Sequence, residues 1–178
     1  GRQEQGLNPI VNFGESHIKN YRVAGMPQQA YSLGFEYRDP KYWWVGVNAN
    51  FLTDLYVDDS PLLRTNNFFQ EPGLGGAAYS DVDENVARKL LKQEKLDDIF
   101  LLNVTGGKSW RIGSKTLGFF ASVNNVLGLE YKTGGFEQAR NANYREVLMD
   151  NASATRTFGS KYKYAYGGTY FLNIYMNL

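Results

Sequence analysis

Hydrophobic and polar residues alternate along five segments of the chain, residues 30–38, 43–57, 98–112, 117–127 and 169–178. Alternation with a period of two is typical of β-strands, whose successive side chains point to opposite faces. Strands of globular proteins usually have about 5 or 6 residues, so several of these are unusually long. In the longest segment, WWVGVNANFLTDLYV, one parity carries Trp43, Val45, Val47, Ala49, Phe51, Leu55 and Val57.

Short and long connections alternate between these segments. Residues 39–42 (DPKY) and 113–116 (GSKT) have the composition of tight turns, whereas residues 58–97 and 129–163 form long connections. The pattern predicts an all-β antiparallel meander of about five long strands, with the short turns at one end and the long loops at the other. One short helix is predicted in the first long loop, within ENVARKLLKQEKLDD, capped by Ser80 or Asp83.

The apolar parity of the strands fits two environments. In a soluble β-sandwich it would pack on a second sheet, whereas in an outer-membrane β-barrel it would face lipid and the polar parity would face the lumen. Long strands, aromatic residues near strand ends and the alternation of short turns with long loops favour the barrel. The residues expected to face lipid are Trp43, Val45, Val47, Phe51, Leu172, Ile174 and Met176. Those expected to face the lumen are Glu36, Arg38, Asn48 and Asn50.

Five strands cannot close a barrel. The smallest single-chain membrane barrels have about eight strands, and lipid tolerates no open sheet edge. The chain is therefore expected to be part of a larger barrel or to assemble with other chains.

Composition and charge exclude several kinds of site. The 19 basic and 18 acidic residues give a net charge of +1, without the basic balance typical of nucleic-acid-binding proteins. The absence of cysteine removes disulfides, thiol nucleophiles and cysteine-based zinc sites. His17 is the only histidine. We therefore expect neither an enzyme nor a cofactor. The loop acids match no calcium-loop spacing; they are Asp54, Asp58, Asp59, Asp81 and Asp83.

Three segments resemble TonB-dependent outer-membrane receptors of the Bacteroidetes type. FASVNNVLGLEY (120–131) is similar to the signature of their penultimate strand, with Asn124, Asn125 and Tyr131 at the motif positions. Residues 21–58 resemble the late part of the barrel, and GGFEQARNANYR (134–145) resembles a surface loop.

The resemblance implies that residues 1–178 are the C-terminal segment of a barrel of about 22 strands, with the plug domain and earlier strands absent. Such a receptor imports a scarce solute, for example a siderophore, glycan or peptide, with energy relayed by TonB. It implies an outer-membrane location, with residues 1–29, 58–97 and 129–163 extracellular and the C-terminus periplasmic. The implied partners are the remaining barrel and plug, TonB through the missing N-terminal part, and membrane lipid, without nucleic acid.

The last strand is implied to carry an assembly signal, although Leu178 stands where such proteins usually have an aromatic residue. The signal positions are Tyr170, Leu172, Ile174, Met176 and Leu178. The loop segments TNNFFQEP (65–72) and EQARNANYR (137–145) are candidates for contact with the solute. An alternative function is a non-transporting outer-membrane scaffold or interaction module, for example for a surface lipoprotein, and the presence or absence of a plug separates the two.

Overall fold

The computed structural model describes residues 14–71, 76–138 and 142–177, whose regular secondary structure is mainly β-strand. They belong to two compact units. The sheet unit comprises residues 22–58, 93–136 and 161–178, and the loop unit comprises residues 1–21, 59–92 and 137–160. Each unit is described by itself.

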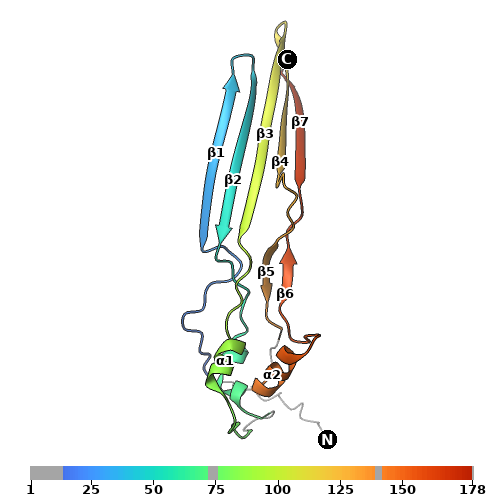
Figure 1. The fold of residues 1–178 in the computed structure, drawn as a ribbon. Helices are drawn as coiled ribbons and strands as arrows, with labels where there is room; N and C mark the ends of the chain where they lie inside the picture. The colour runs from blue at the N-terminus through green and yellow to red at the C-terminus, as the bar shows by residue number, and fades with distance from the viewer. Residues whose placement is uncertain (1–13, 72–75, 139–141, 178) are drawn as a thin grey trace, which may run out of the picture. The chain divides into compact units, whose positions relative to one another are not determined.

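Five antiparallel strands form the main sheet of the sheet unit, in the order β1-β2-β3-β4-β7 (Figure 1). The strands are β1 (Gln29–Asp39), β2 (Trp43–Thr53), β3 (Ile99–Ile112), β4 (Lys115–Asn124) and β7 (Thr169–Asn177). The predicted antiparallel meander is thus confirmed. The β1–β2 and β3–β4 turns lie at the same end of this sheet, as the alternation of connection lengths indicates (Figure 1).

Two strands end earlier than predicted. β2 ends at Thr53 instead of residue 57, and β4 ends at Asn124 instead of residue 127. The next residue in each case has a left-handed backbone, with φ of 57° at Asp54 and 51° at Asn125. Asp and Asn tolerate this conformation better than other residues with side chains, and it breaks the extended path of a strand.

The residues beyond the end of β2 form a small core. Leu55 and Val57, which continue the alternating pattern of residues 43–57, are 4% and 1% exposed and pack with Leu96 and Ile99. A second pair of strands, β5 (Lys132–Phe136) and β6 (Lys161–Tyr164), forms a two-stranded sheet in the same unit. The meander prediction did not include this pair.

The described residues of the loop unit contain two α-helices where one was predicted. The helix α1 (Glu84–Leu90) is capped by Asp83, one of the two expected capping residues. The Asp83 carboxylate accepts hydrogen bonds from two backbone N–H groups of the first turn. The helix α2 (Tyr144–Ala152) was not predicted, although Asn143 and Glu146 form a capping box that the sequence contains. Short 3₁₀-helices, η1 (Pro61–Arg64) and η2 (Asn66–Phe69), complete the described part of the unit.

Aromatic packing holds the loop unit together. Phe68 is 2% exposed and meets Phe69 and Tyr144 edge-on, with ring centroids 5.2 and 6.1 Å apart. Edge-to-face pairs of this kind stabilise a core beyond the area that they bury. The buried residues of this cluster are Leu63, Phe68, Ala87, Ala142, Tyr144 and Val147.

We predict that Phe68→Ala destabilises the loop unit by roughly 3 to 5 kcal/mol, because it removes a fully buried ring and leaves a cavity. Amide hydrogen exchange in α1 and α2 measures this change as a loss of local protection. The matched control is Met149→Ala on α2, where the side chain is 67% exposed and the expected change is below about 0.5 kcal/mol. Equal protection in the two variants would contradict the central role of Phe68.

Candidate functional site

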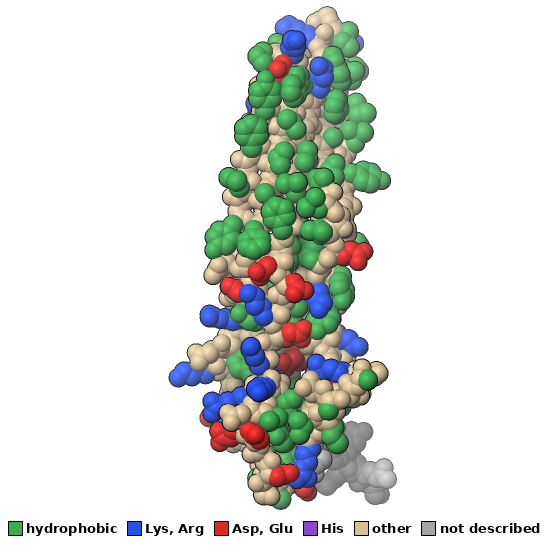
Figure 2. All heavy atoms as spheres, in the orientation of Figure 1, with side chains coloured by type: hydrophobic (Ala, Val, Ile, Leu, Met, Phe, Trp, Pro, Cys, Tyr) green, Lys and Arg blue, Asp and Glu red, His purple; other side chains and the backbone are tan. Residues whose placement is uncertain are grey.

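The register of the five strands places the apolar residues of their alternating patterns on one face of the sheet. Val47 pairs with Val104, Val104 with Val123, and Val123 with Tyr170. The seven residues predicted to face lipid therefore share one face. Hydrophobic side chains gather over these strands in Figure 2.

This apolar face is open. Leu33 is 78% exposed, and Phe35 and Ile174 are each 70% exposed. Soluble monomers rarely expose a contiguous apolar patch larger than a few hundred Å². Within the residues that the structure describes, no second sheet packs on this face as a β-sandwich would require. The face needs an apolar environment or partner.

Aromatic rings lie toward both ends of the apolar face. At the end with the short turns, Trp43 lies 5.3 Å from Tyr37, and Trp110 lies 5.9 Å from Phe119. At the opposite end of the sheet, the rings of Tyr31 and Phe51 stack at 6.4 Å. Between them the side chains are mainly aliphatic. This distribution is typical of a surface that crosses two interfaces between water and lipid.

The opposite face carries the four residues predicted to face the lumen, and they hydrogen-bond along it. Arg38 Nε donates to Glu36 Oε1 at 2.6 Å. Asn48 Nδ2 donates to Ser32 Oγ at 3.0 Å, and Asn50 Nδ2 donates to Asn48 Oδ1 at 2.5 Å. These partly exposed groups are suited to contact with water or polar protein.

An aromatic strip on the polar face was missed by the sequence analysis. Trp44 stacks on Phe120 at 5.9 Å, Phe120 lies 6.1 Å from Phe171, and the guanidinium of Arg38 lies 5.3 Å from the Trp44 ring. Trp44 covers Gly107, where an added Cβ would come 2.8 Å from the indole Nε1. A sequence signal for this strip was present, because a large aromatic residue, Trp44, pairs across strands with a glycine, Gly107.

The three residues of the family motif have local structural roles here. Asn125 is 6% exposed, and its side chain donates to the Leu129 carbonyl at 2.8 Å and accepts from the Leu129 N–H at 3.1 Å. It thereby closes the turn after β4. Asn124 is the last residue of β4, and Tyr131 packs against the small core of Leu55 and Val57.

The residues of the expected assembly signal lie on one edge strand. Tyr170, Leu172, Ile174 and Met176 share one face of β7 and are 59% to 88% exposed. Leu178 lies outside the described residues. β7 pairs only with β4 within the described part of the chain.

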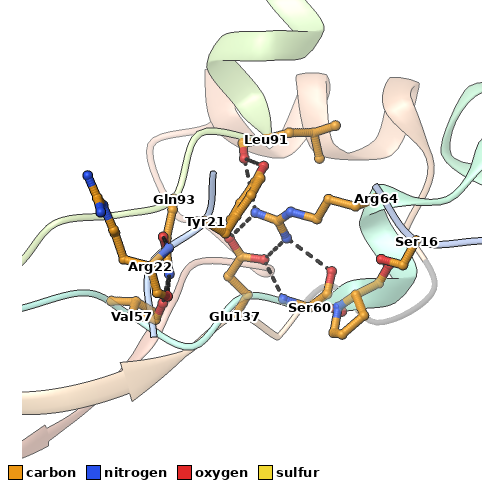
Figure 3. Close-up of polar contacts among 10 residues, drawn as sticks. Ser16, Tyr21, Arg22, Val57, Ser60, Arg64, Leu91, Gln93 and Glu137 are labelled. Carbon is orange, nitrogen blue, oxygen red and sulfur yellow. Dashed lines mark hydrogen bonds and ion pairs between the residues drawn. The ribbon is translucent and has the colours of Figure 1, made fainter. Parts of the chain in front are cut away.

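Arg64 is the buried hub of the loop unit (Figure 3). Its side chain is 2% exposed and forms an ion pair with Glu137 through both terminal nitrogens. Nη1 also donates to the Ser60 carbonyl at 3.1 Å, and Nη2 donates to the Leu91 carbonyl at 3.0 Å. The ring of Tyr21 lies 4.9 Å from the guanidinium carbon. One side chain thus joins four segments that are distant in sequence.

The electrostatics favour a permanently charged Arg64. Burial alone lowers the pKa of the guanidinium, but the hydrogen bonds and charge of Glu137 outweigh burial and raise the pKa above its ordinary value. Arg64 therefore keeps its charge, and its ion pair with Glu137 has a structural role. Only Nε lacks a hydrogen-bond partner within the described residues.

A pocket of about 600 Å³ opens in the loop unit beside this hub. Its walls include the rings of Tyr21, Phe69 and Tyr79 and the polar side chains of His17 and Arg88. The volume lies within the range of small-molecule sites, which combine apolar walls with a few polar groups.

The two loop segments expected to contact a solute are only partly suited to it. In residues 65–72, Thr65 and Phe69 line the pocket, whereas Phe68 is buried in the core. In residues 137–145, Glu137 is engaged by Arg64, and Arg145 Nη2 donates to Asp81 at 2.9 Å. Residues 72 and 139–141 lie outside the described residues.

Three of the five acidic loop residues, Asp54, Asp81 and Asp83, have local partners. Asp54 receives a hydrogen bond from Lys95 at 2.7 Å, which lowers the pKa of its carboxyl group, and Asp83 caps α1. Among residues 14–71, 76–138 and 142–177, no group of three potential ligand residues is arranged to hold a metal ion. In the same ranges, no helix is long and apolar enough to span a membrane.

Comparisons of the chain with protein-family models, with curated proteins and with solved structures found no match.

We predict that Glu137→Gln destabilises the loop unit by roughly 3 to 5 kcal/mol, because it leaves the buried Arg64 cation without its counter-charge. Limited proteolysis and hydrogen exchange of residues 59–71 measure the loss. The matched control is Glu84→Gln, which breaks the ion pair between Glu84 and Arg88. These two side chains are 82% and 79% exposed, so the stability of the loop unit should change little. The same small effect at both positions would contradict the role of Arg64 as a hub.

Proposed function

We propose that the five-stranded sheet forms part of the wall of a transmembrane β-barrel in a bacterial outer membrane. The observation that carries the proposal is the pairing of a continuous, exposed apolar face with a hydrogen-bonded polar face on the same strands. Lipid covers the first face, and the polar interior of the barrel contacts the second.

Strand length supports this placement. The five strands are 9 to 14 residues long. A tilted strand needs about 9 to 11 residues to cross the hydrocarbon layer. The aromatic rings toward both ends of the apolar face then lie at the two interfaces with water.

The sheet edges require further strands. β1 pairs only with β2, and β7 only with β4, within the described part of the chain. Because lipid cannot hydrogen-bond the unpaired backbone groups of an edge, both edges must pair with strands from elsewhere. A sheet of this kind is one segment of a larger barrel.

The transport role rests on the sequence resemblance. Residues 21–58, 120–131 and 134–145 resemble TonB-dependent receptors, and we propose that the chain is the C-terminal part of such a transporter, which imports a scarce solute. Its partners are then the remaining barrel, the plug and TonB. The loop unit is extracellular in this arrangement, and its pocket beside Arg64 is the place where we expect contact with the solute.

The proposal predicts opposite tolerance of a charge at two neighbouring residues of β2. Val47→Arg places a guanidinium on the apolar face near the middle of the strand and should cost about 2 to 4 kcal/mol, whereas Asn48→Arg on the polar face should cost much less. Urea unfolding of the intact native protein in lipid vesicles measures the difference. Equal tolerance at the two positions would contradict the proposed membrane placement.

A further inference from the structure

Lys108 interrupts the apolar parity of β3. The register places it between Trp43 of β2 and Phe119 of β4, and its Nζ lies 5.7 Å from the ring of Trp110. The side chain is half-buried, and no ion pair engages it within the described residues. A cation thus lies among three aromatic rings on an apolar surface, without a counter-charge.

A second lysine lies at the same end of the sheet. Lys41 is exposed in the β1–β2 turn, and the Ser109 N–H donates to the Tyr42 carbonyl at 2.9 Å, which holds this turn beside β3. The acid closest in sequence is Asp39, whose carboxylate already accepts from the Lys41 N–H at 2.8 Å and from the Tyr37 hydroxyl at 3.2 Å. Two basic residues, Lys41 and Lys108, therefore lie at the end of the sheet that carries the short turns.

The next row of residues on the apolar face has its small side chains on the three central strands, between Tyr37 of β1 and Leu172 of β7. Val45 pairs with Gly106, and Gly106 pairs with Ala121. Gly106 has no room for a side chain without a shift of its surroundings, because an added Cβ would lie 3.1 Å from the Trp44 carbonyl oxygen. An apolar chain that runs along the face from Lys108 meets small side chains in this row.

We propose that Lys108 and Lys41 bind the phosphate of an anionic membrane phospholipid, whose acyl chain lies over Val45, Gly106 and Ala121. The inference rests on the proposed function, because it requires the apolar face to lie in lipid. Lysine in such a position keeps its charge by reaching the head-group layer while its methylene groups stay on apolar surface. An anionic lipid supplies the missing counter-charge, and a zwitterionic head group compensates it less completely.

Tryptophan quenching by brominated lipids tests this site, since bromine quenches indole fluorescence on contact and Trp43 and Trp110 flank Lys108. The intact native protein is reconstituted in phosphatidylcholine, and brominated phosphatidylglycerol or brominated phosphatidylcholine is added. The signal of interest is the quenched fraction that disappears in the Trp43→Phe, Trp110→Phe double variant. We expect brominated phosphatidylglycerol to bind about 30-fold more tightly than brominated phosphatidylcholine, as two lysine contacts supply.

The preference should fall to about fivefold in Lys108→Gln, should disappear in the Lys41→Gln, Lys108→Gln double variant, and should shrink at high salt. The matched control is Arg111→Gln, which removes an exposed cation at the same end of the sheet but on its polar face, and should leave the preference unchanged. Equal quenching of the unsubstituted protein by the two lipids, or a preference that stays undiminished in Lys108→Gln or survives in the double variant, would overturn the lipid site and leave the proposed function standing. Absence of quenching by either lipid would contradict both.

Discussion

The antiparallel register of the five-stranded sheet determines the chemistry of both of its faces. Each of the four pairings, from β1 to β7, places the mainly apolar set of one strand's alternating residues beside the mainly apolar set of the next, so that these side chains share one face. A shift of one residue in any pairing would move that strand's apolar side chains to the opposite face. Lys108 and the aromatic strip around Trp44 depart from this separation, and both lie toward the end with the short turns.

The two units use different physical means to become stable. In the sheet unit, most large side chains of the main sheet stay exposed, so its stability depends on strand pairing and on what covers its faces. The loop unit buries Phe68 and Tyr144 and fastens its segments through the Arg64–Glu137 pair. A buried ion pair contributes little net stability, but the loss of one partner is costly. The Arg64–Glu137 pair therefore favours one specific arrangement of the segments that it joins. Such an arrangement can hold long connections in one shape beside a pocket.

Structural features whose sequence signals lie within a few neighbouring residues could be predicted, and features that depend on distant residues could not. Alternation along residues 43–53 and 169–177 predicted the strands, since a period of two is visible without knowledge of the partner strand. The predicted ends of β2 and β4 were wrong because a single residue with a left-handed backbone, Asp54 or Asn125, ends the strand while the apolar pattern continues. The helix α2 was missed because only its capping box signals it. The Arg64–Glu137 pair joins residues that are 73 positions apart, and no local pattern predicts such a contact.

Spin labelling along β2 can distinguish a lipid-facing from a water-facing apolar side, and the chain suits it because it contains no cysteine. A nitroxide is attached to single cysteines at each of residues 43–53 in the intact native protein in lipid bilayers, and its collisions with oxygen and with a water-soluble nickel complex are compared. If the apolar face lies in lipid, the collision rates alternate with a period of two residues. Oxygen contact is then highest at Val45, Val47, Ala49 and Phe51, and nickel contact is higher at the residues between them. Nickel contact as high at Val47 and Ala49 as at Asn48 and Asn50 would contradict a lipid-facing apolar side.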